Sequence, residues 1–192
     1  AELSVSRTAP QFTSIGFYGS NMIRGQVVKD FETYDFMGID GEAMLYEEGA
    51  PSLPRVSRFY RIPETGGVDL VVNSAEFELV ENYNALPYVV EGNQFRKDNS
   101  DPLIYGRDAW YPENVVEISD PMQMRDFRVV TVTLYPVQVN PVTRQARIYH
   151  DIQVDIVPNS EPGVNEMLRH RRPAKSWIPI YQHLIENLDD SA

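Results

Sequence analysis

Side chains that could carry acid–base, nucleophilic or metal chemistry are few in this sequence. It has no cysteine and three histidines among its 192 residues, His150, His170 and His183. Without cysteine there is no thiolate nucleophile, no disulfide and no sulfur-ligated metal. The histidines also lack the Glu-flanked pair one helical turn apart that hydrolytic zinc sites use. The sequence therefore predicts neither a cofactor nor a metal site.

Carboxylates and serines indicate equally little chemistry. Asp35, Asp40 and Glu42 lie around two glycines, but their spacing fails the calcium-loop pattern, and a solvated turn is the better interpretation. No serine lies in a nucleophile-elbow sequence. His150 falls on the apolar face of a predicted strand, where a hydrogen-bonded core histidine is more common than a general base. An independent hydrolase is thus the least favoured function.

The charge balance argues against two classes of partner. Lys and Arg number 17 and Asp and Glu 28, which leaves a net charge of −11. Such a chain repels nucleic-acid phosphates and anionic lipid surfaces, and it has no run of about 18 apolar residues that could span a bilayer. We therefore expect neither a nucleic-acid nor a membrane partner, and a monomer when the chain is isolated.

Short runs rich in Val, Ile, Tyr, Phe and Thr, separated by 14 prolines and 11 glycines, indicate the fold class. This spacing predicts an all-β protein, an antiparallel two-sheet β-sandwich of the jelly-roll type, formed as a single domain of residues 1–192. The clearest strand is 147–157, in which the alternate residues from Ile148 to Ile156, His150 included, form the predicted buried face. Residues 127–139 are its predicted hairpin partner.

Three further features complete the predicted architecture. Asn140-Pro141-Val142-Thr143 supplies the hairpin turn, and Pro136 places the partner strand at an edge or a bulge because it cannot donate to a ladder. A locally basic linker is expected over 158–175. Apolar residues three and four apart predict a short C-terminal helix over 176–189, with Ser176 as its N-cap.

Residues 91–109 break the strand pattern and are predicted to form a long projecting loop. Between positions 91 and 102 there are ten or more polar or turn residues, interrupted by Phe95 and by the pair Arg96-Lys97. Loops longer than ordinary hairpin connections are usually functional or disordered. Taken alone, a basic pair on such a loop is more often solvated than functional.

The aromatic residues offer an alternative function. Tyr105, Trp110 and Tyr111 could form a sugar-stacking platform on a β scaffold. The chain would then be a carbohydrate-binding or adhesive module of a secreted protein. Packing inside the sandwich is the commoner fate of strand aromatics and is the competing interpretation.

Several separated motifs from Gly49 to the C-terminus are colinear with a known family. They are Gly49-Ala50-Pro51-Ser52-Leu53-Pro54 with Arg55-Val56-Ser57-Arg58, Trp110-Tyr111-Pro112, Ser119-Asp120-Pro121, Arg125-Asp126-Phe127-Arg128, and Pro136-Val137-Gln138-Val139-Asn140-Pro141-Val142-Thr143 with Arg147-Ile148-Tyr149. Together they resemble the N-terminal propeptides of gingipain-type cysteine peptidases, whose catalytic domains have a caspase-like fold. The last motif coincides with the hairpin expected from residue alternation.

The resemblance implies a non-catalytic propeptide that acts as an intramolecular chaperone and a reversible inhibitor. Its partner would be the catalytic domain of its own precursor, an exported bacterial protein located in the periplasm or outside the cell. In the family, a loop places a basic side chain in the specificity pocket of the peptidase. By position this loop corresponds to Phe95, Arg96, Lys97, Asp98 and Asn99.

Arg96 is the implied anchor, because a guanidinium forms paired hydrogen bonds with a carboxylate that an ammonium copies poorly. Lys97 suits a lysine-selective enzyme, and Arg107 lies close enough in the chain to compete. The chain has no basic residue at its very end, so we expect either a junction beyond residue 192 or a peptidase that prefers another residue type. The basic stretch with Arg169, Arg171, Arg172 and Lys175 is the alternative candidate processing region.

Overall fold

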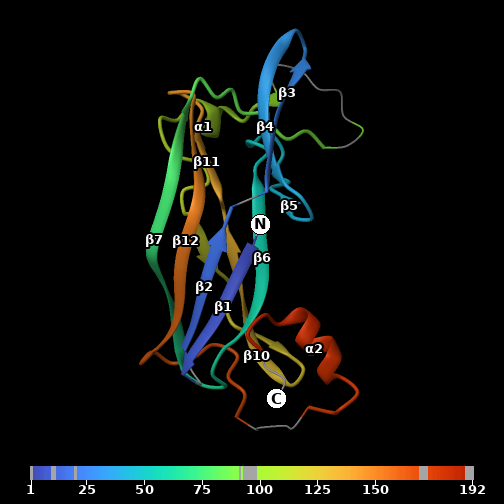
Figure 1. The fold of residues 1–192 in the computed structure, drawn as a ribbon, viewed down its shortest axis with the longest axis vertical. Helices are drawn as coiled ribbons and strands as arrows, with labels where there is room; N and C mark the ends of the chain where they lie inside the picture. Colours follow the sequence, from blue (N-terminus) through green and yellow to red (C-terminus); the bar gives the residue numbers. More distant parts are fainter. Residues whose placement is uncertain are drawn as a thin grey trace.

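The computed structural model describes residues 2–9, 12–19, 21–90, 92, 99–168 and 173–188, with the side chains of residues 7–9 excluded. In these parts of the chain, most residues belong to antiparallel strands. The strands form two five-stranded sheets and a separate two-stranded hairpin. Figure 1 shows the long strands running the length of the molecule, with the hairpin at one end and a short helix at the other.

The first sheet is built on β12 (Gln145–Asn159), the longest strand together with β7 (Gly67–Glu81). β7 pairs with β12 along its whole length on one side. On the other side, β2 (Phe12–Tyr18) and β11 (Val137–Asn140) share the edge of β12. β1 (Glu2–Ala9) pairs with β2 and completes the sheet.

The second sheet is centred on β10 (Phe127–Leu134). β6 (Pro54–Arg61) pairs with one side of β10, and the short β5 (Ala43–Met44) extends the sheet beyond β6. On the other side of β10 lie two short strands, β8 (Val116–Ile118) and β9 (Met122–Met124).

Apolar side chains from the inner faces of the two sheets form one shared core. It joins Ile15 and Phe17 of β2 to Tyr60 of β6 and to Val130 and Val132 of β10, all of them almost fully buried. Side chains alternate across a strand, so each sheet contributes every second residue to this layer. The predicted two-sheet β-sandwich with a short C-terminal helix is confirmed.

The predicted strand 127–139 is divided between the two sheets. β10 ends at Leu134 in the second sheet, and β11 begins at Val137 in the first sheet, after the corner at Tyr135 and Pro136. A single long partner strand for β12 was therefore a wrong prediction. Because proline has no N–H to donate, Pro136 suits the point at which the chain leaves one ladder and enters the other.

The predicted hairpin turn itself is confirmed between β11 and β12. The Asn140 Oδ1 accepts hydrogen bonds from the backbone N–H groups of Val142 and Thr143, at 3.1 and 3.2 Å. This side-chain mimic of a backbone turn is the reason asparagine is favoured at such positions.

His150 does not lie in the core. A β-bulge between Tyr149 and Asp151 shifts the register of β12, so that Tyr149 is buried and His150 is exposed, with its Nε2 3.7 Å from a carboxylate oxygen of Glu76. The bulge interrupts the alternation only locally, because Ile148 before it and Ile152 and Val154 after it are buried as expected. The expectation of a buried histidine was wrong for this reason.

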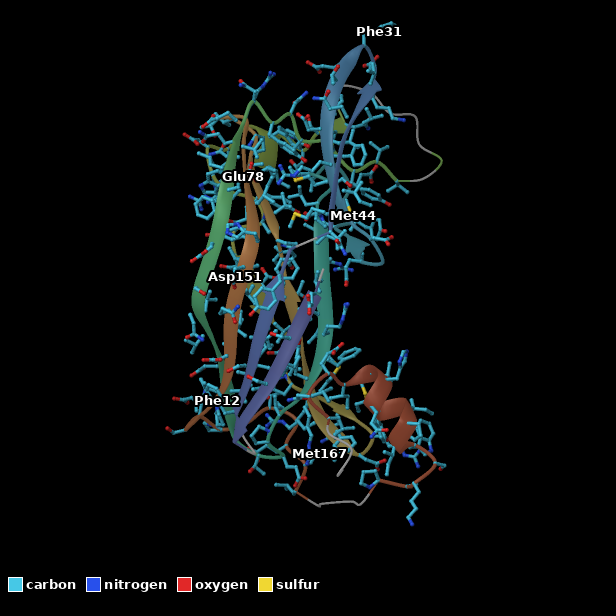
Figure 2. All side chains as sticks on the ribbon, in the orientation of Figure 1. Phe12, Phe31, Met44, Glu78, Asp151 and Met167 are labelled. Carbon is cyan, nitrogen blue, oxygen red and sulfur yellow. The ribbon has the colours of Figure 1, made fainter. Side chains whose placement is uncertain are left out.

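β3 (Met22–Lys29) and β4 (Glu32–Ile39) form the separate hairpin. Its base is part of the protein interior, because Met37 packs in a second core with Leu53 and Tyr83. Its far end carries Phe31 and projects beyond the rest of the molecule (Figure 2).

Helix α2 (Ile178–Leu184) lies at the opposite end (Figure 1). It starts after Trp177, and no side chain caps it, so Ser176 is not its N-cap. Tyr181 of the helix, and Ile185 directly after it, pack against Phe127 and Val129 of β10. This packing stabilises a helix too short to be stable alone.

Candidate functional site

The two ends of the segment that contains residues 91–98 are held by one turn, Glu47–Ala50. The backbone N–H of Gly49 donates to the Tyr88 carbonyl at 2.9 Å, before the segment begins. The Gly49 carbonyl accepts from the backbone N–H of Asp101 at 2.9 Å, after the segment ends. The Tyr88 N–H donates in turn to the Ala50 carbonyl at 2.8 Å. Tyr88 and Asp101, on either side of the segment, are therefore both fixed at Gly49.

Only a glycine suits position 49. Its φ is +81°, in the left-handed region, and a Cβ there would lie 2.9 Å from the Asn99 carbonyl oxygen and 3.0 Å from the Asp101 nitrogen. Any other residue at position 49 would have a strained backbone, and its Cβ would push Asn99 and Asp101 away. The sequence motif contained Gly49, but no sequence signal indicated that it fastens a segment 40 residues away.

Helix α1 (Pro102–Tyr105) follows the segment directly. The Asp101 side chain caps it by accepting a hydrogen bond from the Leu103 N–H at 2.8 Å, and Pro102 occupies its first turn. The Tyr105 hydroxyl donates to the Ala85 carbonyl at 3.0 Å, and burial raises the Tyr105 pKa, so this hydroxyl stays protonated. These contacts fix the outgoing end of the segment to the body.

Of the five residues predicted to form the inhibitory loop, Phe95, Arg96, Lys97 and Asp98 lie outside the described residues. Asn99 lies within them, partly buried, with its carbonyl beside Gly49. The competing residue Arg107 is exposed just beyond α1.

In the predicted processing region, Arg169, Arg171 and Arg172 also lie outside the described residues. Lys175 is exposed in the turn that precedes α2. The Trp177 N–H donates to the Ala174 carbonyl at 2.8 Å and closes this turn.

The three aromatic residues of the carbohydrate hypothesis are each engaged with the body. The Arg147 guanidinium lies 3.9 Å from the centre of the Trp110 ring. The Tyr111 hydroxyl donates to Glu47 at 2.7 Å, and the Tyr105 hydroxyl to a backbone carbonyl. Trp110 and Tyr111 do line an open pocket of about 350 Å³. The Arg147 guanidinium therefore covers one face of the Trp110 indole.

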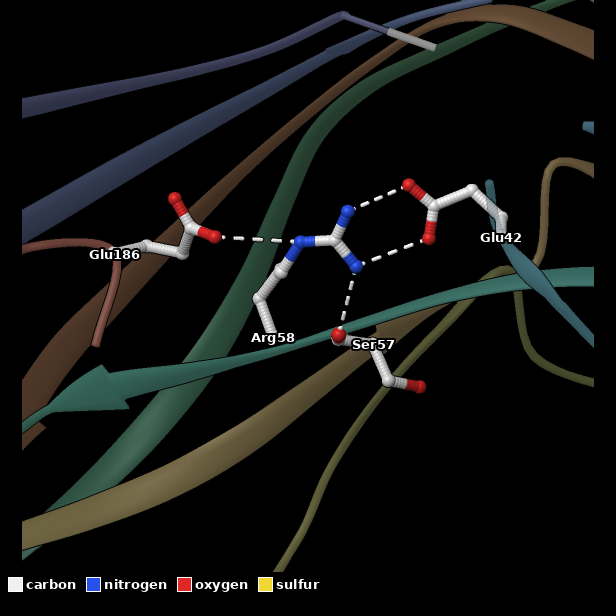
Figure 3. Close-up of polar contacts among 4 residues, drawn as sticks. All are labelled: Glu42, Ser57, Arg58 and Glu186. Carbon is white, nitrogen blue, oxygen red and sulfur yellow. Dashed lines mark hydrogen bonds and ion pairs between the residues drawn. The ribbon is translucent and has the colours of Figure 1, made fainter. Parts of the chain in front are cut away.

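A second polar cluster holds the end of the described chain. Figure 3 shows the Arg58 guanidinium of β6 between two carboxylates: it donates to both oxygens of Glu42, at 2.5 and 3.0 Å, and its Nε lies 3.3 Å from Glu186. The hydrogen bond to Glu42 is the main cause that raises the Arg58 pKa. Glu42 therefore belongs to an ion pair, and its assignment to a solvated turn was wrong.

Asn187 completes this attachment by binding the edge of β6. Its Oδ1 accepts from the Arg61 N–H at 2.7 Å, and its Nδ2 donates to the Arg61 carbonyl at 2.9 Å and to the Thr13 hydroxyl at 2.8 Å. Ile185 also forms a parallel bridge with Phe59 of β6. The residues after α2 are thus bound to the sandwich as an additional edge segment, which no sequence pattern had indicated.

Two negative findings concern the parts of the chain that the structure describes. These parts hold no group of three or more histidine or acidic side chains placed to bind a metal ion. No helix among them is both long and apolar enough to cross a bilayer.

Two solved structures share this architecture. One is described as the complex of Porphyromonas gingivalis RgpB pro- and mature domains. The similarity has a TM-score of 0.82 at 23% identity and covers 96% of each chain. The other concerns the zymogenic latency of gingipain K from the same organism, with a TM-score of 0.68 at 16% identity, covering 82% of this chain and 92% of that one. The fold is that of a gingipain prodomain.

The sequence comparisons define the family. Gingipain R2 of P. gingivalis strain W83 is 32% identical over 171 residues, which is 86% of this chain and 22% of that protein. Gingipain R1 of P. gingivalis is 33% identical over 151 residues, 76% of this chain and 15% of that protein. The profile of the Propeptide_C25 family matches residues 5–168.

The chain belongs to the Propeptide_C25 family. It is a non-catalytic propeptide of a gingipain-type cysteine peptidase precursor, as its motifs predicted. It spans about a fifth or less of the length of these curated relatives.

Proposed function

We propose that this chain keeps the peptidase of its own precursor latent and assists its folding by docking on the catalytic domain. Family membership supports this proposal. The observation that carries it furthest is the Gly49 turn, which holds both ends of the segment containing Arg96 by hydrogen bonds to Tyr88 and Asp101. A loop with fixed ends loses less conformational entropy when a partner binds it.

The blocking group in this proposal is a basic side chain of the loop Phe95–Asn99. The Arg96 guanidinium enters the specificity pocket of the peptidase and forms two parallel, charge-assisted hydrogen bonds with a carboxylate at its floor. Lys97 takes this role in a lysine-selective enzyme. Arg107, the third candidate, is exposed and follows α1.

Three single substitutions test the blocking group: Arg96→Ala, Lys97→Ala and Arg107→Ala. Each variant is titrated against the mature peptidase of the same precursor with a fluorogenic peptide as substrate. We expect 1:1 inhibition by the unaltered chain and a loss of about 2 kcal/mol, roughly 30-fold, for Arg96→Ala. Lys97→Ala and Arg107→Ala remove the same charge, and a comparable loss in one of them would identify that residue as the anchor in place of Arg96. Unaltered inhibition by Arg96→Ala would remove this residue from the role.

The chaperone part of the proposal has its own test. The catalytic domain is denatured and refolded with and without the chain added in trans. We expect a higher yield of active peptidase, after removal of the chain, when the chain is present during refolding. Equal yields would leave inhibition as the chain's role and exclude assisted folding.

We also propose an exported precursor, located in the periplasm or outside the cell, whose basic region Arg169, Arg171, Arg172 and Lys175 is cut during maturation. The exposed turn at Lys175 suits a peptidase cleavage site. Cell fractionation and N-terminal sequencing of the released fragments test both points. The isolated chain is proposed to be a monomer, which size-exclusion chromatography with light scattering tests.

A further inference from the structure

The β3–β4 hairpin ends in an aromatic side chain that the fold does not use. Phe31 is fully exposed, at 102% of its reference area, and Val28 beside the turn is 68% exposed. Figure 2 shows Phe31 at the extreme end of the molecule. Tyr34, three residues further along, is 5% exposed. The hairpin therefore buries aromatic surface at its base and presents it to the outside at its tip.

The backbone at the tip makes this choice of residue costly. Asp30 and Phe31 have φ values of +48° and +64°, and they form a two-residue turn between the paired residues Lys29 and Glu32. Such a turn favours Asn-Gly or Asp-Gly, and bulky residues are rare at positive φ. Turn formation therefore does not explain Phe31. An exposed, strained aromatic is the kind of residue that serves as an anchor in a protein interface.

The hairpin is attached to the same block that holds the candidate inhibitory loop. The Asp35 N–H donates to the Asn84 carbonyl at 2.7 Å, and the Asp35 carboxylate accepts from the Asn84 N–H at 2.8 Å. The Asn84 side chain also donates to the Thr33 carbonyl at 2.8 Å. Four residues later the same segment reaches Tyr88 and the Gly49 turn. Hairpin and loop ends are thus connected by a short hydrogen-bonded path.

We propose that the hairpin tip, Phe31 with Val28, is a second docking element for the catalytic domain. The ring inserts into an apolar depression of that domain outside its active-site cleft. This inference rests on the proposed function, because a partner that receives the loop must lie over this end of the molecule. The hairpin continues for three residue pairs beyond Asp35. At a rise of about 3.3 Å per pair, its tip lies roughly 10 Å beyond the attachment at Asp35. The charged Lys29 and Asp30 around the ring form the polar rim of an interface with an apolar centre.

Phe31→Gly is the decisive substitution, because it removes the ring and relieves the backbone. Glycine adopts positive φ without strain, so the variant keeps the fold and unfolds at the same or a higher temperature than the unaltered chain. Inhibition of the mature peptidase is expected to weaken about 30-fold. Leu168→Gly is the matched control, since Leu168 is 83% exposed and follows Met167 at the opposite end (Figure 2). This control is expected to inhibit as the unaltered chain does.

A second arm places the contact outside the cleft. The peptidase is first blocked by a small covalent active-site inhibitor, and binding of the chain is measured directly. Phe31→Gly is expected to bind the blocked enzyme more weakly than the unaltered chain, by about the same factor. Equal binding of the two chains to the blocked enzyme overturns a contact outside the cleft.

The outcomes separate the inference from the proposed function. If the unaltered chain inhibits and Phe31→Gly inhibits equally well, the docking role of the tip is overturned and the latency function stands. An equal loss for Phe31→Gly and Leu168→Gly also overturns it, because the effect is then not specific to the tip. If the unaltered chain neither binds nor inhibits the peptidase, both proposals fall.

Discussion

The carbonyl oxygen of Asn99 occupies the space that a side chain on Gly49 would need, 2.9 Å from the position of its Cβ. Gly49 and Asn99 are fifty positions apart in sequence, and Asn99 is the last residue of the candidate inhibitory loop 95–99. The hydrogen bond from the Asp101 N–H to the Gly49 carbonyl keeps them together. The backbone at Asn99 and Asp101 can therefore lie this close to residue 49 only because glycine has no Cβ.

Gly49→Ala is expected to destabilise the chain and to weaken inhibition. The left-handed backbone costs about 1–2 kcal/mol for alanine, and the clash with Asn99 adds about 1–3 kcal/mol, because backbone atoms must move. Gly41→Ala is the matched control: Gly41 has φ +76°, but nothing lies within 4 Å of a Cβ there. Urea denaturation and inhibition constants measure both. Equal losses for the two variants would show that the contact with Asn99 contributes nothing.

Asn187→Ala is expected to loosen the segment after α2. The side chain is 6% exposed, and its removal leaves the Arg61 N–H and carbonyl without these partners. A buried unsatisfied group costs about 1–3 kcal/mol, so a loss of about 2–3 kcal/mol is expected by urea denaturation. Limited proteolysis should then cut within 178–188 more rapidly.

The control for Asn187 is an exposed asparagine with one hydrogen bond. Asn73→Ala removes a bond from Nδ2 to the Asp155 carboxylate at 2.7 Å, and a surface change of this kind is expected to cost about 0.5 kcal/mol or less. A loss for Asn187→Ala as small as that of Asn73→Ala would mean that the segment is not held by this side chain.

Glu166→Gln is expected to change the pH dependence of stability. Backbone hydrogen bonds from Gly66, at 2.8 Å, and from Gly163, at 3.1 Å, lower the pKa of the Glu166 carboxyl, with a smaller contribution from Arg128. A carboxyl with a lowered pKa stabilises the fold above its ordinary pKa of about 4.3, and this stabilisation is lost as the pH falls through the lowered value.

Thermal unfolding between pH 7 and pH 3 measures this effect. The Glu166→Gln variant should unfold at a lower temperature than the unaltered chain at pH 7, because the amide lacks the charge that the two N–H groups favour. The two curves should converge as Glu166 becomes protonated. A constant separation over the whole range would contradict a role for the charge.

Residue types and their spacing determined much of this protein before any coordinates. The alternation of apolar and polar residues predicted β12, and Asn140 with its neighbours predicted the turn before it. The motifs from Gly49 onward indicated a gingipain-type propeptide. They also indicated residues 95–99 as the candidate inhibitory loop. These are local features, because alternation, turn geometry and motif order depend on residues that are close in the chain.

The tertiary structure decided what neighbours in the chain could not. The bulge that exposes His150 depends on the register with Glu76 of β7, and the corner at Pro136 depends on two sheets lying face to face. Asn187 meets Thr13 across 174 positions of sequence. The free energy of each such contact depends on partners that only the folded chain brings together, so a sequence read along its length holds no signal for them.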